Sequence, residues 1–214
     1  MTYTTASGEV IPQGTDAFNP PAQFKTWADH GALWHNRIVV ALDANRTALA
    51  APELRDGIEC YVTGTDITWL YEGSTWKRWN SGWITYTPTL TGFAVGTIGT
   101  PAPVSETKYR YVNGRVRVYF KFVFGSNGTP PTSARITTPV AAATLGVLSI
   151  VGGTGNILRI ATGTQYPLAP ALYNSVNTIA LFYTNGALAD FTPTVPWTWA
   201  NGDYIVGELE YDPA

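Results

Sequence analysis

Residues able to act as an acid, a base or a metal ligand are few in this sequence of 214 residues. The two histidines, His30 and His35, are five positions apart and do not share one face of a helix, which disfavours a metal site. No histidine follows them, so a Ser-His-Asp triad in the C-terminal part is excluded. The single Cys60 is expected to be a small buried apolar residue. The chain has no phosphate-binding, dinucleotide, nucleophile-elbow or zinc motif, so we expect no catalytic residue, metal, cofactor or enzymatic activity.

One pair of carboxylates could still do chemistry, because Glu208 and Glu210 lie on the same face of the last expected strand. Glycoside hydrolysis uses two carboxyl groups about 5–9.5 Å apart. A simpler role for these glutamates is to pair with five cations. Strand alternation places these cations together on one face of a predicted hairpin. We expect ion pairing, with an anionic ligand on the cations or catalysis as the alternatives. The cations are named the basic ridge: Lys108, Arg110, Arg115, Arg117 and Lys121.

Aromatic residues give a second lead to a binding site. Trp197 and Trp199 stand in a proline-interrupted segment before the last strand, and exposed tryptophans stack on sugar rings. The alternative is that the two tryptophans straddle a strand, with one in the core and the other at an interface. The candidate ligand-binding residues are Trp197, Trp199, Phe191, Tyr166, Tyr173 and Asn174.

The composition excludes several classes of protein. Lys and Arg number 13 against 15 Asp and Glu, a formal net charge of −2, which argues against a nucleic-acid partner bound through a basic surface. No apolar run reaches the roughly 18–20 residues that span a bilayer, so we expect no membrane insertion. The N-terminal residues lack the basic start and apolar core of a signal peptide, which predicts synthesis in a cytoplasm without export by that route.

The fold class that we expect is mainly β, because the chain has little charge, many aromatic residues and many Gly and Pro. The clearest hairpin joins Thr107–Val112 to Arg115–Phe124 through Asn113-Gly114, a strong two-residue turn signal. Residues 83–214 are predicted to form a β-sandwich or jelly-roll head of about eight or nine strands. Residues 51–82 are predicted to form a small three-stranded β module.

Residues 20–50 are predicted to form a long helix and residues 1–19 an extended arm. Asn19 and the prolines after it suit a helix start, and Pro52 suits its stop. The helix needs a partner for its apolar face, either copies of itself in a trimer or the sheet of its own chain. Its coiled-coil seam is His35, Ile38, Leu42, Asn45 and Leu49, and a competing stripe is Phe24, Trp27, Trp34, Ile38 and Ala41.

A long stretch of the C-terminal part carries almost no charge. From Phe122 to Ala189 the charged residues are Arg135 and Arg159. Interface cores are depleted in charge and enriched in aromatic residues, so we expect much of this stretch to be buried between copies of the chain. The alternative is a surface covered by Ser, Thr and Asn.

Several motifs together resemble tail-fibre and minor tail proteins of phages that infect actinobacteria. The resemblance covers roughly residues 52–214 and depends on no single motif. Its residues are Leu54-Arg55-Asp56-Gly57 with Tyr61-Val62-Thr63-Gly64-Thr65-Asp66, then Trp83 and Tyr86-Thr87-Pro88-Thr89-Leu90-Thr91-Gly92-Phe93, then the hairpin Tyr109-Arg110-Tyr111-Val112-Asn113-Gly114-Arg115-Val116, and finally Ala200-Asn201-Gly202-Asp203-Tyr204-Ile205 with Gly207 and Tyr211. The sequence departs from the family at Glu208-Leu209 and at Asp212.

The resemblance implies a homotrimeric protein of the virion, made in the cytoplasm of a bacterial host. In that family the C-terminal β head often touches the host envelope, which implies a host surface glycan as partner. The arm of residues 1–19 would dock on other tail or baseplate proteins. The alternative is a purely structural virion component, such as a decoration, collar or baseplate protein without a ligand.

Overall fold

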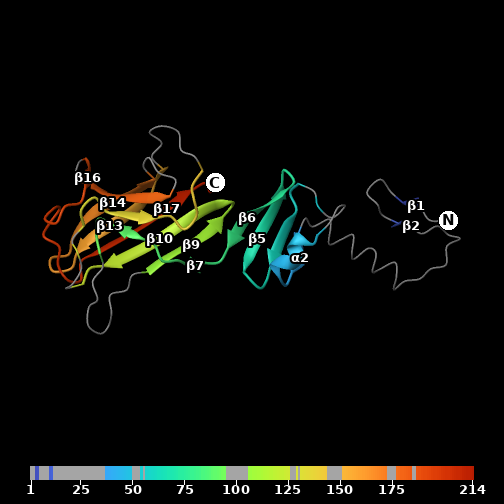
Figure 1. The fold of residues 1–214 in the computed structure, drawn as a ribbon, viewed down its shortest axis with the longest axis horizontal. Helices are drawn as coiled ribbons and strands as arrows, with labels where there is room; N and C mark the ends of the chain where they lie inside the picture. Colours follow the sequence, from blue (N-terminus) through green and yellow to red (C-terminus); the bar gives the residue numbers. More distant parts are fainter. Residues whose placement is uncertain are drawn as a thin grey trace. The chain divides into compact units, whose positions relative to one another are not determined.

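The computed structural model describes residues 3–4, 10–11, 37–49, 54, 56–94, 106–125, 129, 131–143, 151–172, 177–184 and 187–214 (Figure 1). The described chain is mainly β, which confirms the expected class. It divides into two compact units, Met1–Trp79 (unit 1) and Asn80–Ala214 (unit 2). In unit 1 the short strands β1 (Tyr3–Thr4) and β2 (Val10–Ile11) form an antiparallel pair. Within the described residues, no helix has the length and apolar character of a membrane span.

A four-stranded sheet forms the described core of unit 1. Its strands are β3 (Arg37–Val40), β4 (Glu59–Val62), β5 (Ile67–Glu72) and β6 (Thr75–Ser81), in that order across the sheet. The last three correspond to the predicted small module, and β3 adds a parallel neighbour to β4. Cys60 on β4 has no exposed surface, as expected of a small apolar residue, and burial raises the pKa of its thiol.

The described part of residues 20–50 does not contain the long helix predicted there. Residues 37–40 form strand β3, and the one helical segment there is α2 (Asp43–Thr47), which has five residues. The run Ile38-Val39-Val40 is β-branched, and such side chains suit a strand better than a helix. Of the predicted seam, Ile38 lies in β3, Leu42 precedes α2, Asn45 lies within it and Leu49 follows it, so these four share no helix face. His35 and residues 20–34 lie outside the described residues.

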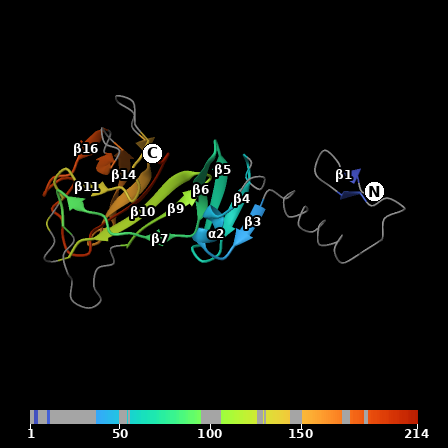
Figure 2. The same ribbon diagram turned by 45° about the vertical axis from the view of Figure 1, so that its right-hand side comes forward.

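Unit 2 is one large sheet with the strand order β7-β9-β10-β17-β13-β14-β15-β11-β8, where β12 also pairs with β14 and β16 with β15. Figures 1 and 2 show β7, β9 and β10 along one side of the unit and β13, β14 and β16 along the other. The strands are β7 (Ile84–Thr85), β8 (Leu90–Thr91), β9 (Glu106–Val112), β10 (Arg115–Val123), β11 (Arg135–Thr137), β12 (Val151–Gly152), β13 (Thr154–Arg159), β14 (Thr164–Leu172), β15 (Thr178–Thr184), β16 (Leu188–Asp190) and β17 (Tyr204–Tyr211).

The sheet of unit 2 curls around its core. Strands β7 and β8 stand at opposite ends of the strand order, yet residues 86–89 alone connect them. So short a connection holds the two ends of the sheet near each other. Side chains from both halves therefore enclose one core, in which the ring centroids of Phe93 and Phe122 are 5.4 Å apart.

The hairpin of β9 and β10 has the predicted register. Val116 lies opposite Tyr111 and Arg117 opposite Arg110, and both turn residues have positive φ, 51° at Asn113 and 79° at Gly114. Positive φ at both positions is the geometry that an Asn-Gly turn adopts without strain. The alternation along β10 is also confirmed, because its inward side chains are buried and its outward ones are not. The inward residues are Val116, Val118, Phe120 and Phe122.

Two glycines let the middle strands of unit 2 approach an aromatic ring. Gly155 on β13 lies opposite Gly207 on β17, which in turn lies opposite Phe120 on β10. A Cβ added at Gly207 would stand 2.8 Å from Cζ of Phe120, and one at Gly155 would stand 2.3 Å from the carbonyl oxygen of Val206. The buried Phe120 ring therefore occupies the space that a side chain would take at Gly207, while the backbone of β17 occupies that space at Gly155.

Candidate functional site

The structure corrects the expectation that Trp197 and Trp199 are exposed for stacking on a sugar. Their exposed fractions are 6% and 8%, and Phe191 is 1% exposed, so all three belong to the core of unit 2. The two tryptophan rings pack against each other with centroids 5.5 Å apart. Tyr166 is half-buried and packs on Trp197. The remaining candidates, Tyr173 and Asn174, lie outside the described residues.

A buried carboxylate holds this aromatic segment in the core. Asp203 has no exposed surface, and its Oδ2 accepts hydrogen bonds from Trp197 Nε1 at 3.0 Å and from the backbone N–H of Ala200 at 2.9 Å. Its Oδ1 accepts a third from the backbone N–H of Ile160 at 3.0 Å. Gly202 turns the chain into this position with a φ of +90°. The Gly202-Asp203 part of the closing motif therefore has a structural role.

The basic ridge is neutralised at the end nearest the Asn113-Gly114 turn. Glu210 pairs with two guanidinium groups, that of Arg115 at 2.9 Å and that of Arg117 at 3.1 Å. Arg115 also pairs with Asp212 at 2.9 Å. The predicted ion pairing is thus present for Glu210, whereas no ion pair of Glu208 is found among the described residues.

Away from that turn, Arg110, Lys108 and Lys121 of the ridge contact aromatic rings, and Lys108 also pairs with Glu106. The guanidinium carbon of Arg110 lies 4.6 Å from the ring centroid of Trp83, and Lys108 Nζ lies 5.2 Å from the same centroid. Lys121 Nζ lies 5.2 Å from the ring of Tyr204. Trp83 is 43% exposed, an unusual state for so large an aromatic residue.

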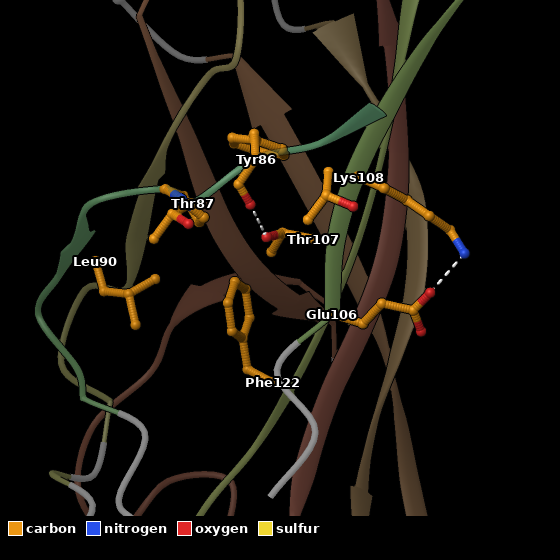
Figure 3. Close-up of a pocket in the computed structure, with 9 residues that line it drawn as sticks. Tyr86, Thr87, Leu90, Glu106, Thr107, Lys108 and Phe122 are labelled. Atoms are coloured by element: carbon orange, nitrogen blue, oxygen red, sulfur yellow. Dashed lines mark hydrogen bonds and ion pairs between the residues drawn. The ribbon is translucent and has the colours of Figure 1, made fainter. Parts of the chain in front are cut away.

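Unit 2 has a pocket of about 310 Å³, and Lys108 is among the residues that line it (Figure 3). One wall is the connection from β7 to β8 and the other is the start of β9, and the ring of Phe122 forms the floor. The side chains of Lys108 and Glu106 point away from the Phe122 ring to the other side of β9, where Lys108 Nζ and a carboxylate oxygen of Glu106 form an ion pair at 2.5 Å. The volume is at the lower end of the range for small-ligand sites. The lining residues are Thr85, Tyr86, Thr87, Pro88, Leu90, Glu106, Thr107, Lys108 and Phe122.

Hydrogen bonds fix both ends of the pocket wall. The hydroxyl of Thr107 donates to the carbonyl oxygen of Tyr86, whose N–H donates to the Thr107 carbonyl at 3.2 Å. Further along, the N–H of Thr89 donates to the hydroxyl of Thr137 at 2.9 Å. Burial raises the pKa of Tyr86 far above its ordinary value, so this phenol stays neutral. A wall tied at both ends keeps the pocket open without a ligand.

The chemistry of the pocket suits a saccharide. An apolar floor can take the C–H face of a pyranose ring, while the hydroxyls of Thr85 and Thr87 can bond to its hydroxyl groups. In the described part of the chain, no group of three or more His, Cys, Asp or Glu side chains could hold a metal ion.

Sequence reasoning missed this pocket as a site. The sequence analysis named Trp83 and Tyr86 only as part of the motif that resembles tail-fibre proteins. In the structure, continuing the pairing of β7 with β9 by one residue sets Trp83 beside Arg110 of the ridge, but no local pattern in the sequence predicts this pairing. An exposed tryptophan beside cations is a surface feature that calls for an explanation.

Comparisons with known proteins do not narrow the function. No family model matches the chain, and a search of curated proteins gives no match either. The function therefore has to be inferred from the sequence motifs and from the geometry of unit 2.

Proposed function

We propose that this chain is a homotrimeric tail-fibre or receptor-binding protein of a bacteriophage, and that unit 2 is a head that binds a glycan on the host cell surface. In this proposal the curled sheet serves as the β-sandwich or jelly-roll head, and the arm of residues 1–19 docks on other tail or baseplate proteins. The protein acts in the virion by adhesion and not by catalysis.

One observation supports this proposal above the others. The segment Tyr86–Leu90, which is part of the motif that resembles tail-fibre proteins, forms a wall of the described pocket in unit 2. Trp83, from the same motif region, stands exposed beside the side chain of Lys108, a residue that also lines the pocket. The sequence resemblance and the cavity thus meet at the same residues.

A purely structural virion component is the second candidate. The observation that favours it is the burial of Trp197 and Trp199, which removes the most aromatic segment of unit 2 from any ligand surface. An image of the labelled protein in a virion separates the two functions. A receptor-binding protein lies at the distal tip, whereas a decoration or collar protein lies on the body of the particle.

Pocket substitutions test the glycan proposal. The full chain is expected to bind one or more bacterial surface glycans on an array, and Trp83→Ala is expected to weaken that binding about tenfold because a stacking face is lost. Thr87→Trp, which fills the pocket, is expected to abolish it. The matched control is Ile160→Ala, an apolar residue 56% exposed on the turn between β13 and β14, which should bind within about twofold of the parent. Unchanged binding in both pocket variants would contradict the proposed site.

Native mass spectrometry of the full chain tests the trimer. The expected result is a mass of three copies, because the sequence stretch from Phe122 to Ala189 offers little charge for a monomer surface. A stable monomer across the micromolar range would contradict this part of the proposal and leave glycan binding to be judged on its own.

A further inference from the structure

We infer that the pocket of unit 2 selects a neutral sugar unit that carries an acetamido group, and that the hydroxyl of Thr107 recognises the N–H of that group. The inference deepens the proposed glycan binding and rests on it. It depends on three features of the pocket: the side chains that face it carry no charge, its floor is apolar, and one of its hydroxyl groups can only accept a hydrogen bond.

No charged side chain among the described lining residues faces the pocket. Glu106 and Lys108 are the charged residues of the lining, and Figure 3 shows both side chains pointing away from the Phe122 ring to the other side of β9, where they pair with each other. The phenol of Tyr86 is neutral, because burial raises its pKa. A sugar acid in the pocket would lose hydration without gaining a counter-charge, so the ligand is expected to be neutral there.

The floor and one side of the pocket are apolar. The ring of Phe122 and the side chain of Leu90 lie toward the same space, and Pro88 lies on the wall between them and Thr87 (Figure 3). A sugar hydroxyl laid on this floor would lose its hydrogen bonds to water, whereas a methyl group gains free energy by leaving water. The small volume of about 310 Å³ leaves room for one sugar unit and not for an extended chain.

The hydroxyl of Thr107 gives the pocket a hydrogen-bond acceptor close to this floor. Its proton is already donated to the carbonyl oxygen of Tyr86, so its remaining lone pairs can only accept. Figure 3 shows the Thr107 side chain between Tyr86 and the ring of Phe122, on the pocket side of β9. A ligand group beside Thr107 must therefore be a donor, while the hydroxyl of Thr87 on the other wall can donate to a ligand oxygen.

An acetamido group combines the three properties that the pocket requires. It is neutral, its N–H can donate to Thr107, and its methyl group is two bonds from that nitrogen and can reach the apolar floor. Its carbonyl oxygen can accept from the hydroxyl of Thr87. A simple hydroxyl group has a donor but no methyl group beside it, and the methyl group of a deoxy sugar has no donor, so each satisfies only part of the lining.

Calorimetric titration of the full chain with matched disaccharides tests the inference. Two pairs of probes differ in the terminal unit, N-acetylglucosamine against glucose and N-acetylgalactosamine against galactose, and a further probe ends in glucuronic acid. In at least one pair the acetamido sugar should bind about tenfold more tightly than its partner, because it adds a buried methyl group and a hydrogen bond. The glucuronic acid probe should bind more weakly than the glucose probe.

Three variants isolate the role of Thr107. Thr107→Val keeps the shape of the side chain without the acceptor oxygen and should reduce the acetamido preference to about threefold or less. Thr107→Ser keeps the hydroxyl and should keep the preference. Thr137→Val is the matched control for the wall, because Thr137 lies outside the pocket lining and accepts a hydrogen bond from the N–H of Thr89 at the other end of the wall. This control should also keep the preference.

The outcomes separate this inference from the function on which it rests. If neither acetamido sugar binds more tightly than its partner, or if the acid binds most tightly, the inference is overturned while glycan binding stands. A preference that survives Thr107→Val in a folded variant, or that Thr137→Val removes equally, overturns the role of Thr107. If no probe binds, the inference is overturned and the glycan array judges the proposed function separately: bound glycans leave that function standing, and a blank array rejects it.

Discussion

Replacing Asp203 by alanine is expected to lower the free energy of unfolding of unit 2 by about 4 kcal/mol. The carboxylate is fully buried and accepts three hydrogen bonds. Its loss leaves the buried indole N–H of Trp197 without an acceptor, at a cost of about 2 kcal/mol, and weakens two partly buried backbone contacts by about 1 kcal/mol each. Urea unfolding followed by tryptophan fluorescence measures the change.

The matched control for this prediction is Asp212→Ala. That carboxylate is 71% exposed and pairs with Arg115 at the surface, so its loss should cost less than about 1 kcal/mol. Asp203→Asn, which keeps one acceptor oxygen, should fall between the two. Equal stabilities for the alanine variants at 203 and 212 would show that Asp203 does not hold the aromatic segment.

Gly155→Ala is expected to destabilise unit 2 by about 3 kcal/mol, although it adds a single methyl group. The new Cβ would stand 2.3 Å from the carbonyl oxygen of Val206 and 2.8 Å from Cα of Gly207. Both are backbone atoms in a neighbouring strand, so relief requires the strands to move apart and loosens their hydrogen bonds. Thermal unfolding of unit 2, followed by near-ultraviolet circular dichroism, detects the loss.

Gly163→Ala separates the effect of crowding from that of backbone conformation. Gly163 has a φ of +68° but nothing within 4 Å of its added Cβ, so the cost there is the positive φ alone, about 1 kcal/mol. If Gly155→Ala lowers the free energy of unfolding by no more than Gly163→Ala does, the fold does not require the close approach of β13 and β17.

The β9–β10 hairpin was predictable because its signals are local. A two-residue Asn-Gly turn fixes the register, and strict alternation decides which face is buried. The opposition of Arg110 and Arg117 followed from that register, and so did the need for counter-charges, which Glu210 supplies. The strand order of the sheet, in contrast, depends on contacts between distant segments that no local pattern records.

The helix failed at residues 38–40 because two patterns compete there. A 3-4-3-4 spacing of apolar residues is compatible with a helix, while consecutive β-branched residues favour a strand. The nearby strand β4 decides the outcome, since it offers β3 a parallel partner along Arg37–Val40. That partner starts at Glu59, well beyond the window in which helical periodicity is read.

The binding site could not be placed from sequence because exposure depends on tertiary contacts. Trp197 looked exposed next to Pro196, yet a carboxylate six residues later anchors its indole in the core. The sequence around Trp83 gives no clear sign that its side chain is exposed. In the structure its indole contacts Lys108 and Arg110, which lie on a strand that begins at Glu106. Aromatic composition thus favoured a β fold but did not show which ring faces solvent.

The place of β17 in the sheet has a consequence for biosynthesis. This strand is the last of unit 2 in the sequence, yet it lies between β10 and β13 and joins the two halves of the sheet. A nascent chain that has emerged from the ribosome only as far as β16 therefore presents two unpaired edges, one on each half. Such edges pair readily with other chains. The sheet of this unit can therefore be completed only after β17 has emerged, and chaperones that shield unpaired strands are expected to act on it until then.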